Sequence, residues 1–325
     1  MSKRALITGI GGQDGAYLSR LLLEKGYDVF GLEPRRSNYS RGRLRRLGVE
    51  DKVVYVSGDV TDASSITRAV NLVKPHEVYN LAAQSFVGAS FSSPASTMSV
   101  NAMGTVNVLE AIRHESKDIK MYQASTSELF GLVNTEHQNE DTPFYPRSPY
   151  GVSKLAAHWS TINYRESYNL FACCGILFNH ESPLRGVEFV TKKVTDAVAR
   201  IVLSKQDSLE LGNIDAKRDW GFAGDYVDAM WRMLQAAEPE EYVVATGEVH
   251  SVRDLCSVAF DFAGLNYEDY VVQSQHLYRP TDVPLLRGDP AKIKRNLGWS
   301  ASTPMRSMIE NMVEEEVKRL SAEGK

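Results

Sequence analysis

The chain has 325 residues, of which 43% are hydrophobic, and its 37 Lys and Arg residues against 41 Asp and Glu residues give a net charge of −4. A chain of this length can bury a large core and has room for about two domains, while its acidic balance argues against a nucleic-acid-coating protein, which needs a basic surface. No apolar run suits a signal peptide or a membrane span, and three cysteines without a disulfide pattern indicate a reducing compartment, so we expect a cytoplasmic protein with no membrane partner.

The first predicted element is a short apolar strand over residues 5–8, followed at once by a glycine turn and an amphipathic helix. The turn reads Gly9-x-x-Gly12-x-x-Gly15. Glycines permit a tight turn with close backbone approach, and the helix that follows points its N-terminus at a pyrophosphate. Three glycines alone also suit an ordinary turn, so the strand–turn–helix context carries the prediction of a dinucleotide site.

The second predicted strand, over residues 28–32, ends beside residues that bear on the choice of dinucleotide. Glu33 could bind the ribose 2′-hydroxyl of NAD, whereas Arg35, Arg36 and Ser37 could bind the 2′-phosphate of NADP. Two guanidinium groups and a hydroxyl should attract a 2′-phosphate more strongly than one carboxylate repels it, because arginine binds phosphate oxygens bidentately. We therefore predict NADP.

Further charged residues lie on either side of the third predicted strand, which covers residues 53–56. Four arginines suit either a solvated helix face or a ligand contact, and both interpretations stay open; they are Arg41, Arg43, Arg45 and Arg46. After the strand, Asp59 and Val60 suit an adenine contact, with a turn-forming or helix-capping aspartate as the alternative.

Strands and helices keep alternating up to about Asn179. Predicted helices cover residues 66–73, 106–112 and 153–168, and predicted strands cover 77–81, 119–123 and 172–178. This alternation is typical of an α/β fold with a doubly wound parallel (Rossmann) sheet. Beyond it, predicted helices at 189–203, 225–237, 252–263 and 305–320 indicate a smaller α/β domain. We predict a dinucleotide-binding domain over 1–179, to which about 225–247 returns, and a second domain over 180–325 that mainly binds substrate.

Two segments carry the candidate catalytic groups. Tyr150 and Lys154 lie four residues apart on a predicted helix and so share one face. A phenol is a poor base at neutral pH, but a nearby cation favours the phenolate, which can accept a proton from an alcohol. Thr126 and Glu128 follow a predicted strand, at the sheet edge where ligands bind. Thr126 suits the same substrate hydroxyl, Glu128 adds a carboxylate, and helix capping by this segment is the alternative.

These motifs together resemble the extended short-chain dehydrogenase/reductases. The resemblance rests on the glycine turn after Thr8, on Asn-Leu-Ala-Ala-Gln-Ser at 80–85, on Thr-Ser-Glu at 126–128 and on the Tyr150/Lys154 pair. More narrowly, the chain resembles the GDP-mannose 4,6-dehydratase family over almost its whole length; the supporting segments are 123–131, 142–154, 163–168, 175–186, 217–221 and 278–280. Two departures are Gly11, where the family commonly has threonine, and Glu33 before the arginine pair.

The resemblance implies a lyase that converts GDP-mannose to GDP-4-keto-6-deoxymannose and water with tightly bound NADP. Tyr150 would remove the 4-hydroxyl proton while C4 gives a hydride to the cofactor. Glu128 would then take the acidified C5 proton and help to expel the 6-hydroxyl as water, assisted by Thr126. The hydride would then return to C6 and a proton to C5. In the family, the arginine-rich loop reaches a neighbouring subunit's cofactor, which implies a homotetramer (or a homodimer).

The motifs and the resemblance together predict the site residues. For the cofactor they are Gly9, Ile10, Gly12, Gln13, Asp14, Gly15, Arg35, Arg36, Ser37, Asp59, Val60, Leu81, Ala82, Ala83, Ser85, Lys154, His180 and Arg185. For the substrate they are Ser85, Glu128, Asn179, Lys193, Arg218 and Arg279, with the two arginines at the diphosphate. No metal site is predicted. Trp220 and Trp299 are assigned to the core.

Other functions remain as alternatives. A related nucleotide-sugar epimerase or reductase needs the tyrosine and lysine but not a carboxylate at Glu128. Dehydratases that act on dTDP-glucose resemble this chain at residues 125–128 but have Ser-Thr-Asp-Glu there, whereas this chain has Ser127 in place of the aspartate. A non-catalytic NADP-binding protein would often lack Tyr150, Lys154 or Glu128, and all three are present.

Overall fold

A seven-stranded sheet forms the centre of the computed structural model, which describes residues 2–35, 37, 39, 41–133, 135–277 and 285–322. The strand order is β3–β2–β1–β4–β5–β6–β11, and every neighbouring pair is parallel. The strands are β1 (Arg4–Thr8), β2 (Asp28–Glu33), β3 (Val54–Ser57), β4 (Glu77–Asn80), β5 (Lys120–Ala124), β6 (Ala172–Leu177) and β11 (Glu241–Val244). The predicted doubly wound parallel sheet is confirmed.

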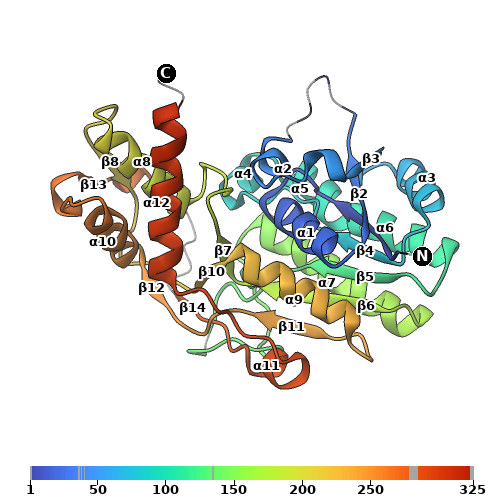
Figure 1. The fold of residues 1–325 in the computed structure, drawn as a ribbon. Coiled ribbons are helices and arrows are strands. Elements are labelled where there is room, and N and C mark those ends of the chain that lie inside the picture. The colour runs from blue at the N-terminus through green and yellow to red at the C-terminus, as the bar shows by residue number, and fades with distance from the viewer. Residues whose placement is uncertain are drawn as a thin grey trace.

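Both faces of the sheet are covered by helices, because its strands are apolar on both sides (Figure 1). In β1, Ala5 and Ile7 belong to one core cluster and Leu6 to another, as the two-residue period of a strand requires. The first face packs against α1 (Gln13–Glu24) and α9 (Ala223–Gln235). The second packs against α3 (Ala63–Val73), α6 (Gly104–Glu115) and α7 (Pro149–Tyr168).

The order of the strands reverses at β1, which has β2 on one side and β4 on the other. In doubly wound sheets the crevice outside the carboxyl ends of the strands at such a reversal binds the ligand. The glycine turn follows β1 and the 81–85 loop follows β4, so these two segments border that crevice.

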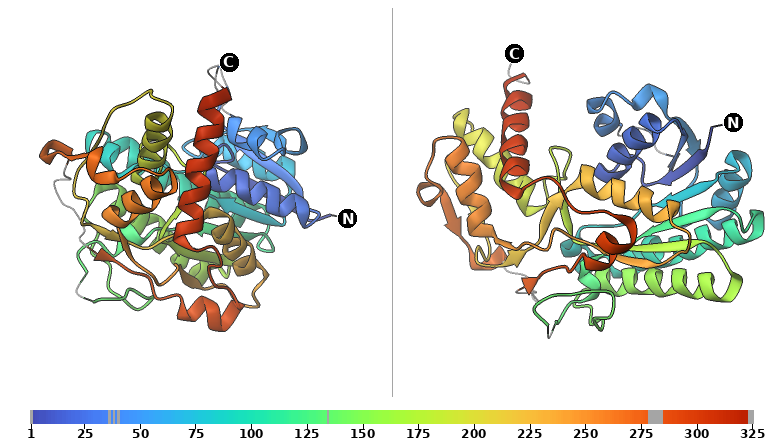
Figure 2. Two further views of the ribbon diagram at one scale, coloured as in Figure 1. Left: turned by 60° about the vertical axis from the view of Figure 1, so that its left-hand side comes forward. Right: turned by 60° about the horizontal axis from the view of Figure 1, so that its bottom comes forward.

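A second group of helices lies beside the sheet rather than on it, as Figure 1 and the right-hand view of Figure 2 show. It contains α8 (Val190–Val202), α10 (Val252–Phe262) and α12 (Met305–Ala322), which pack around a separate core that includes Trp220. Short strands accompany them: β7 (Asn179–Glu181), β8 (Leu209–Leu211), β9 (Lys217–Arg218), β10 (Trp220–Phe222), β12 (His250–Ser251), β13 (Val271–Gln273) and β14 (Leu285–Leu286).

Several short elements were not predicted from the sequence. They are α2 (Gly42–Arg46), α4 (Val87–Ser92), α5 (Pro94–Met98), α11 (Ala291–Leu297), the 3₁₀ turns η1 (Glu50–Lys52), η3 (Ser127–Leu129), η4 (Tyr267–Asp269) and η5 (Gln275–Leu277), and the π-helical turn η2 (Ser99–Met103). Helices this short depend on tertiary contacts, so they leave no readable periodicity. Across the described ranges, no helix has the length and apolar character needed to cross a membrane.

Candidate active site

The glycine turn is packed so closely that two of its positions accept only glycine. Gly9 has a φ of +70°, and a Cβ added there would lie 2.8 Å from the Ala82 amide nitrogen. A Cβ on Gly15 would lie 2.6 Å from the carbonyl oxygen of Gly9. The backbone is therefore bare where a pyrophosphate would approach the N-terminus of α1, so the turn fits a dinucleotide.

A buried threonine holds the second loop of the crevice against this turn. The Thr8 hydroxyl donates to Asn80 Oδ1 at 2.7 Å and accepts from the amides of Leu81 and Ala82 at 3.1 and 3.0 Å. The loops after β1 and β4 are thus fixed to each other at the point where the strand order reverses.

At the end of β2, Glu33 lines the cleft but is already paired. Both of its carboxylate oxygens accept from Arg41, with the shortest contact 2.7 Å from Nη2 to Oε2. The Arg41 guanidinium also lies 3.4 Å from the centre of the Tyr55 ring. The negative charge of Glu33 is therefore balanced inside the protein.

The other residues predicted around the adenosine differ in their placement. Asp59 and Val60 line the cleft, and Asp59 also forms the predicted turn, since its Oδ1 accepts from the Thr61 amide at 2.9 Å. Arg35 and Ser37 are exposed and are not among the residues that line the cleft, whereas Arg36 falls outside the described residues.

A cleft of about 1170 Å³ runs from this adenosine end across to the second group of helices. The predicted site residues that line it are Gly9, Ile10, Gly12, Gln13, Asp14, Gly15, Asp59, Val60, Leu81, Ala82, Ala83, Ser85, Thr126, Glu128, Tyr150, Lys154, Asn179, His180, Arg185, Lys193 and Arg218. Those the sequence did not predict include Arg43, Phe86, Ser125, Phe189, Leu211, Asn213 and His276. A volume of this size suits two large ligands lying end to end.

Tyr150 and Lys154 lie on the same face of α7, as predicted, and both are buried in the wall of the cleft. Burial raises the pKa of Tyr150 to about 12, although a hydrogen bond from Thr126 acts in the opposite direction. The direction is opposite to the lowering that the sequence analysis expected from a nearby cation, and burial is the largest cause. Lys154 donates from Nζ to the Ala124 carbonyl at 2.9 Å, and burial lowers its pKa to about 8.

The segment with Thr126 and Glu128 leaves β5 and turns into η3 against the start of α7. Thr126 Oγ1 accepts from the Glu128 amide at 3.3 Å, so the segment does cap a helical turn while both side chains line the cleft. A Cβ on Gly151 would lie 2.9 Å from the Glu128 carbonyl oxygen. Glycine at this position therefore lets the helix with Tyr150 approach the backbone of Glu128.

On the opposite wall, His180 joins β7 to the first turn of α1. Its Nδ1 lies 2.8 Å from the Phe178 carbonyl and its Nε2 lies 2.8 Å from the Asp14 carboxylate. Both partners are hydrogen-bond acceptors, and this arrangement favours the imidazolium form of the ring. Burial acts to lower the pKa of His180, but Asp14 outweighs burial and raises it.

Two arginines extend this positive region. Arg185 lies 2.9 Å from Glu181 and 3.5 Å from the centre of the Phe189 ring, where it lines the cleft. Arg43 donates to the carbonyls of Leu184 at 2.7 Å and Gly11 at 3.1 Å, beside the glycine turn. The sequence showed a basic run but not which arginine points inward, so the solvated-face interpretation is wrong for Arg43.

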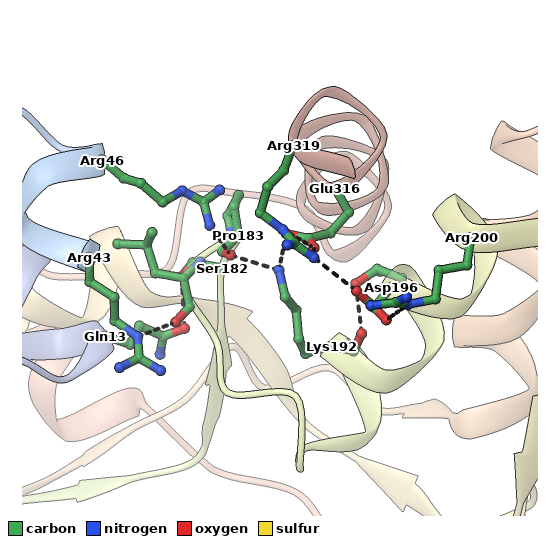
Figure 3. A network of polar contacts seen from close by, with 12 residues as sticks. Gln13, Arg43, Arg46, Ser182, Pro183, Lys192, Asp196, Arg200, Glu316 and Arg319 are labelled. Carbon is green, nitrogen blue, oxygen red and sulfur yellow. Dashed lines mark hydrogen bonds and ion pairs between the residues drawn. The ribbon is translucent and has the colours of Figure 1, made fainter. Parts of the chain in front are cut away.

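Behind this wall, a chain of polar contacts ties the glycine turn to the C-terminal helix (Figure 3). Ser182 donates to Gln13 Oε1 at 2.7 Å, and Lys192 donates to the neighbouring Pro183 carbonyl at 2.8 Å. Lys192 also pairs with Glu316, and both side chains are buried. Figure 3 shows Arg319 closing this group toward Asp196, with 3.1 Å between Nη2 and Oδ1.

The candidate substrate residues approach from the second group of helices. Asn179, Lys193 and Arg218 line the cleft, and Arg218 is buried. Lys193 donates from Nζ to the Glu210 carbonyl at 2.6 Å. The predicted Arg279 falls outside the described residues. Within the part of the chain that is described, no group of three or more His, Cys, Asp or Glu side chains could hold a metal ion.

The features of the sheet and of the cleft together identify the class of protein. A doubly wound sheet, a bare glycine turn at its strand reversal and a buried tyrosine and lysine on one helix face define a short-chain dehydrogenase/reductase. Among solved structures, the UDP-glucose 4-epimerase of Thermus thermophilus in complex with NAD is 26% identical with a TM-score of 0.83, and the match covers 96% of this chain and 98% of the other.

Comparison of the sequence with known proteins identifies the family within this class. The family model described as GDP-mannose 4,6 dehydratase matches residues 6–312. GDP-mannose 4,6 dehydratase 1 of Arabidopsis thaliana is 51% identical, covering 97% of this chain and 90% of the relative. The GDP-mannose 4,6-dehydratase of Vibrio cholerae is 47% identical, covering 98% and 95%. The chain belongs to the GDP-mannose 4,6-dehydratase family.

Proposed function

We propose that this chain removes water from GDP-mannose to give GDP-4-keto-6-deoxymannose, through oxidation at C4, elimination across C5 and C6, and reduction at C6. The observation that carries the proposal is a third proton-transfer group beside the Tyr150 and Lys154 pair. Glu128 lines the same cleft, close to the helix that bears the pair. Oxidation needs one base, whereas elimination needs a further group that takes the C5 proton and protonates the leaving hydroxyl.

Each of the four catalytic residues then has a task. Tyr150 Oη accepts the proton of the 4-hydroxyl, and Thr126, which hydrogen-bonds the tyrosine, orients that hydroxyl. Lys154 supplies a positive charge close to the Ala124 carbonyl and holds the cofactor ribose. Glu128 takes the C5 proton, which is acidified by the 4-ketone, and passes it to the 6-hydroxyl, which leaves as water. Once C6 has been reduced, C5 takes up a proton, and Tyr150 supplies it because it still holds the proton of the 4-hydroxyl. The half-buried position of Glu128 in the cleft wall suits this double role.

A nicotinamide dinucleotide fits the glycine turn, where Gly9, Gly12 and Gly15 would hold it, and it would supply a hydride acceptor for C4 and a hydride donor for C6. NADP is the form we propose, and the pairing of Glu33 supports it. Because Arg41 occupies both carboxylate oxygens, Glu33 neither repels a 2′-phosphate as a free charge nor accepts freely from a 2′-hydroxyl. Asp14, His180 and Arg185 border the same ligand.

We also propose a division of labour between the two parts of the chain. Residues 1–179, with about 225–247 returning to the sheet, hold the cofactor, and 180–325 mainly holds the sugar nucleotide. In support, α9 packs on the same face of the sheet as α1, and β11 extends the sheet beside β6. Asn179, Lys193, Arg218 and Arg279 are the proposed contacts for the nucleotide diphosphate, with Ser85 and Glu128 at the sugar.

The proposed homotetramer (or homodimer) is supported by exposed apolar side chains on neighbouring helices. They lie on α5, η2 and α7 and include Met98, Met103, Val152 and Trp159. Exposed large apolar side chains on helices that pack against one another suit a contact between protein chains. Sedimentation equilibrium measures the assembly, and a monomer at micromolar concentration would contradict it.

The reaction is tested by incubating the protein with GDP-mannose without added NADPH and following the product by mass spectrometry. We expect a product lighter by one water, while the bound cofactor is unchanged after each cycle. A product with the mass of the substrate would indicate epimerisation and would overturn the dehydratase proposal.

The cofactor proposal has a separate test, because binding can be measured without turnover. Titration of the cofactor-free protein with NADP and NAD should give the tighter dissociation constant for NADP. Glu33→Gln should leave that order unchanged if Arg41 already neutralises Glu33. Tighter binding of NAD by the unaltered protein would contradict the assignment.

A further inference from the structure

One buried histidine lies on the catalytic face of α7 without a role in the proposed reaction. Tyr150, Lys154 and His158 are each four residues apart, so they project from successive turns of the same face. The first two reach the cleft. His158 is only 1% exposed and lies behind them, next to the segment that leaves β5.

Its ring contacts that segment directly. His158 Nδ1 lies 2.9 Å from Ser125 Oγ, and both groups are buried. Ser125 is held from its other side as well, because its amide donates to the Gly175 carbonyl on β6 at 2.9 Å. Ser125 lines the cleft and immediately precedes Thr126, so His158 and the Gly175 carbonyl hold the segment one residue before the proton-transfer groups begin.

The ring has little freedom to move or to take a charge. Phe144 and Trp159 pack edge-to-face against it, with ring centres 5.3 and 5.8 Å away. Burial lowers the pKa of His158 to about 4, with a smaller lowering by Arg165 and an opposing effect of Glu241. The imidazole is therefore neutral at neutral pH, and its hydrogen bond to Ser125 stays uncharged.

We propose that His158 is a positioning residue for the proton transfers, which fixes Ser125 and thereby the Thr126–Glu128 segment against Tyr150. The strand exit is then anchored at successive turns of one helix: His158 holds the Ser125 side chain and Lys154 holds the Ala124 carbonyl. Near Tyr150, the helix comes close enough to the Glu128 backbone that only glycine fits at position 151. Rates of proton transfer depend steeply on such placement, since a misplacement of about 1 Å can cost ~100-fold.

The inference rests on the proposed dehydration, and a double-mutant cycle tests it. His158→Phe keeps the aromatic packing and removes the hydrogen bond, Ser125→Ala removes the partner, and the double variant removes both. We expect kcat to fall about tenfold in each single variant and no further in the double variant, because all three lose the same contact. KM for GDP-mannose should change by less than about twofold, since the diphosphate contacts lie elsewhere.

Two further variants separate positioning from general stability. His158→Asn places an amide near the position of Nδ1 and should restore kcat to within about threefold of the unaltered enzyme. Thr161→Val is the matched control, because the Thr161 hydroxyl makes a buried hydrogen bond to the Ala157 carbonyl on the same helix at 2.9 Å. It should lower the melting temperature without lowering kcat.

Failure of this inference is distinguishable from failure of the proposed function. An unaltered enzyme that does not dehydrate GDP-mannose would refute the proposed function; the histidine contact is then read by NMR of ¹⁵N-labelled histidine, where the Nδ1 shift of His158 should change in Ser125→Ala. An unchanged shift, or losses of kcat that add in the double variant, would overturn the positioning role. So would a His158→Phe variant that keeps full kcat.

Discussion

The two walls of the cleft are built in different ways. On the proton-transfer wall, contacts join segments about 30 positions apart, such as Ser125 to His158 and Ala124 to Lys154, and they are made by a strand exit and one helix. The phosphate wall is formed by the glycine turn, His180 and Arg185, with the polar contacts behind them. Several of its contacts join distant residues, such as Lys192 to Glu316, 124 positions apart, and Gln13 to Ser182, 169 positions apart, and several are ion pairs.

The two kinds of contact should affect different properties of the protein, namely the rate of catalysis on one wall and the stability of the fold on the other. The hydrogen bonds of the proton-transfer wall join a helix side chain to a serine hydroxyl or a backbone carbonyl, so removing that side chain leaves no unpaired charge behind. On the phosphate wall, the ion pair of His180 with Asp14 joins β7 to α1, and the pair of Lys192 with Glu316 joins α8 to α12. Removing one partner therefore leaves a buried charge with fewer opposite charges around it. Changes on the proton-transfer wall should therefore act on kcat, and changes on the phosphate wall should act on binding and on folding.

The largest effect is expected at Glu128. Glu128→Gln keeps the shape of the side chain and removes the base, so kcat should fall by about 10²–10⁴-fold with little change in the free energy of unfolding. Oxidation at C4 survives, so reduced cofactor should accumulate and be visible by its absorbance. Full turnover by this variant would remove Glu128 from the mechanism and weaken the contrast between the walls.

The next effect concerns folding. Lys192→Met leaves the buried carboxylate of Glu316 with Arg319 as its remaining cation, and the free energy of unfolding should fall by about 1.5–3 kcal/mol, the scale of a hydrogen bond to a charged group. Lys318→Met is the control, because Lys318 pairs with Glu314 on the exposed face of the same α12 helix and should cost less than about 1 kcal/mol. Urea denaturation measures both, and equal losses would contradict the contrast.

Substrate binding is expected to respond at Arg218. Arg218→Met should raise KM for GDP-mannose by about 10- to 100-fold, the scale of charge-assisted hydrogen bonds to a diphosphate, with a smaller change in kcat. Arg253→Met serves as the control, since Arg253 forms an exposed pair with Asp215. If kcat fell instead while KM stayed constant, Arg218 would belong with the proton-transfer wall.

The smallest effect is a pH dependence. Unfolded His158 takes a proton near pH 6.5, whereas folded His158 resists it down to about 4, so its contribution to stability is lost as the pH falls through this window. Relative to His158→Phe, the unaltered protein should lose about 2 kcal/mol between roughly pH 7 and pH 5. Denaturant titrations at the two pH values measure this, and parallel pH profiles would show that His158 is not held neutral.

Much of the proton-transfer wall could be predicted from the sequence because its residues are close together in the chain. The spacing of Tyr150 and Lys154 alone places them on one helix face, and the position of Glu128 just after a strand places it at the ligand edge. His158 has the same spacing, but an isolated buried histidine is indistinguishable in sequence from a core residue. Its contact with Ser125 was visible only in the structure.

The sequence by itself determined the parallel sheet, the glycine turn and the tyrosine–lysine pair, because strand periodicity, glycine conformations and helical spacing are local properties. Only the tertiary structure decided which charges balance each other: that Arg41 pairs with Glu33, that Arg43 turns toward Gly11, and that Lys192 meets Glu316. These pairings depend on how segments far apart in the chain pack. For each charged side chain the sequence contains several possible partners of opposite charge, and local sequence does not distinguish between them. Folding selects one of them by burial.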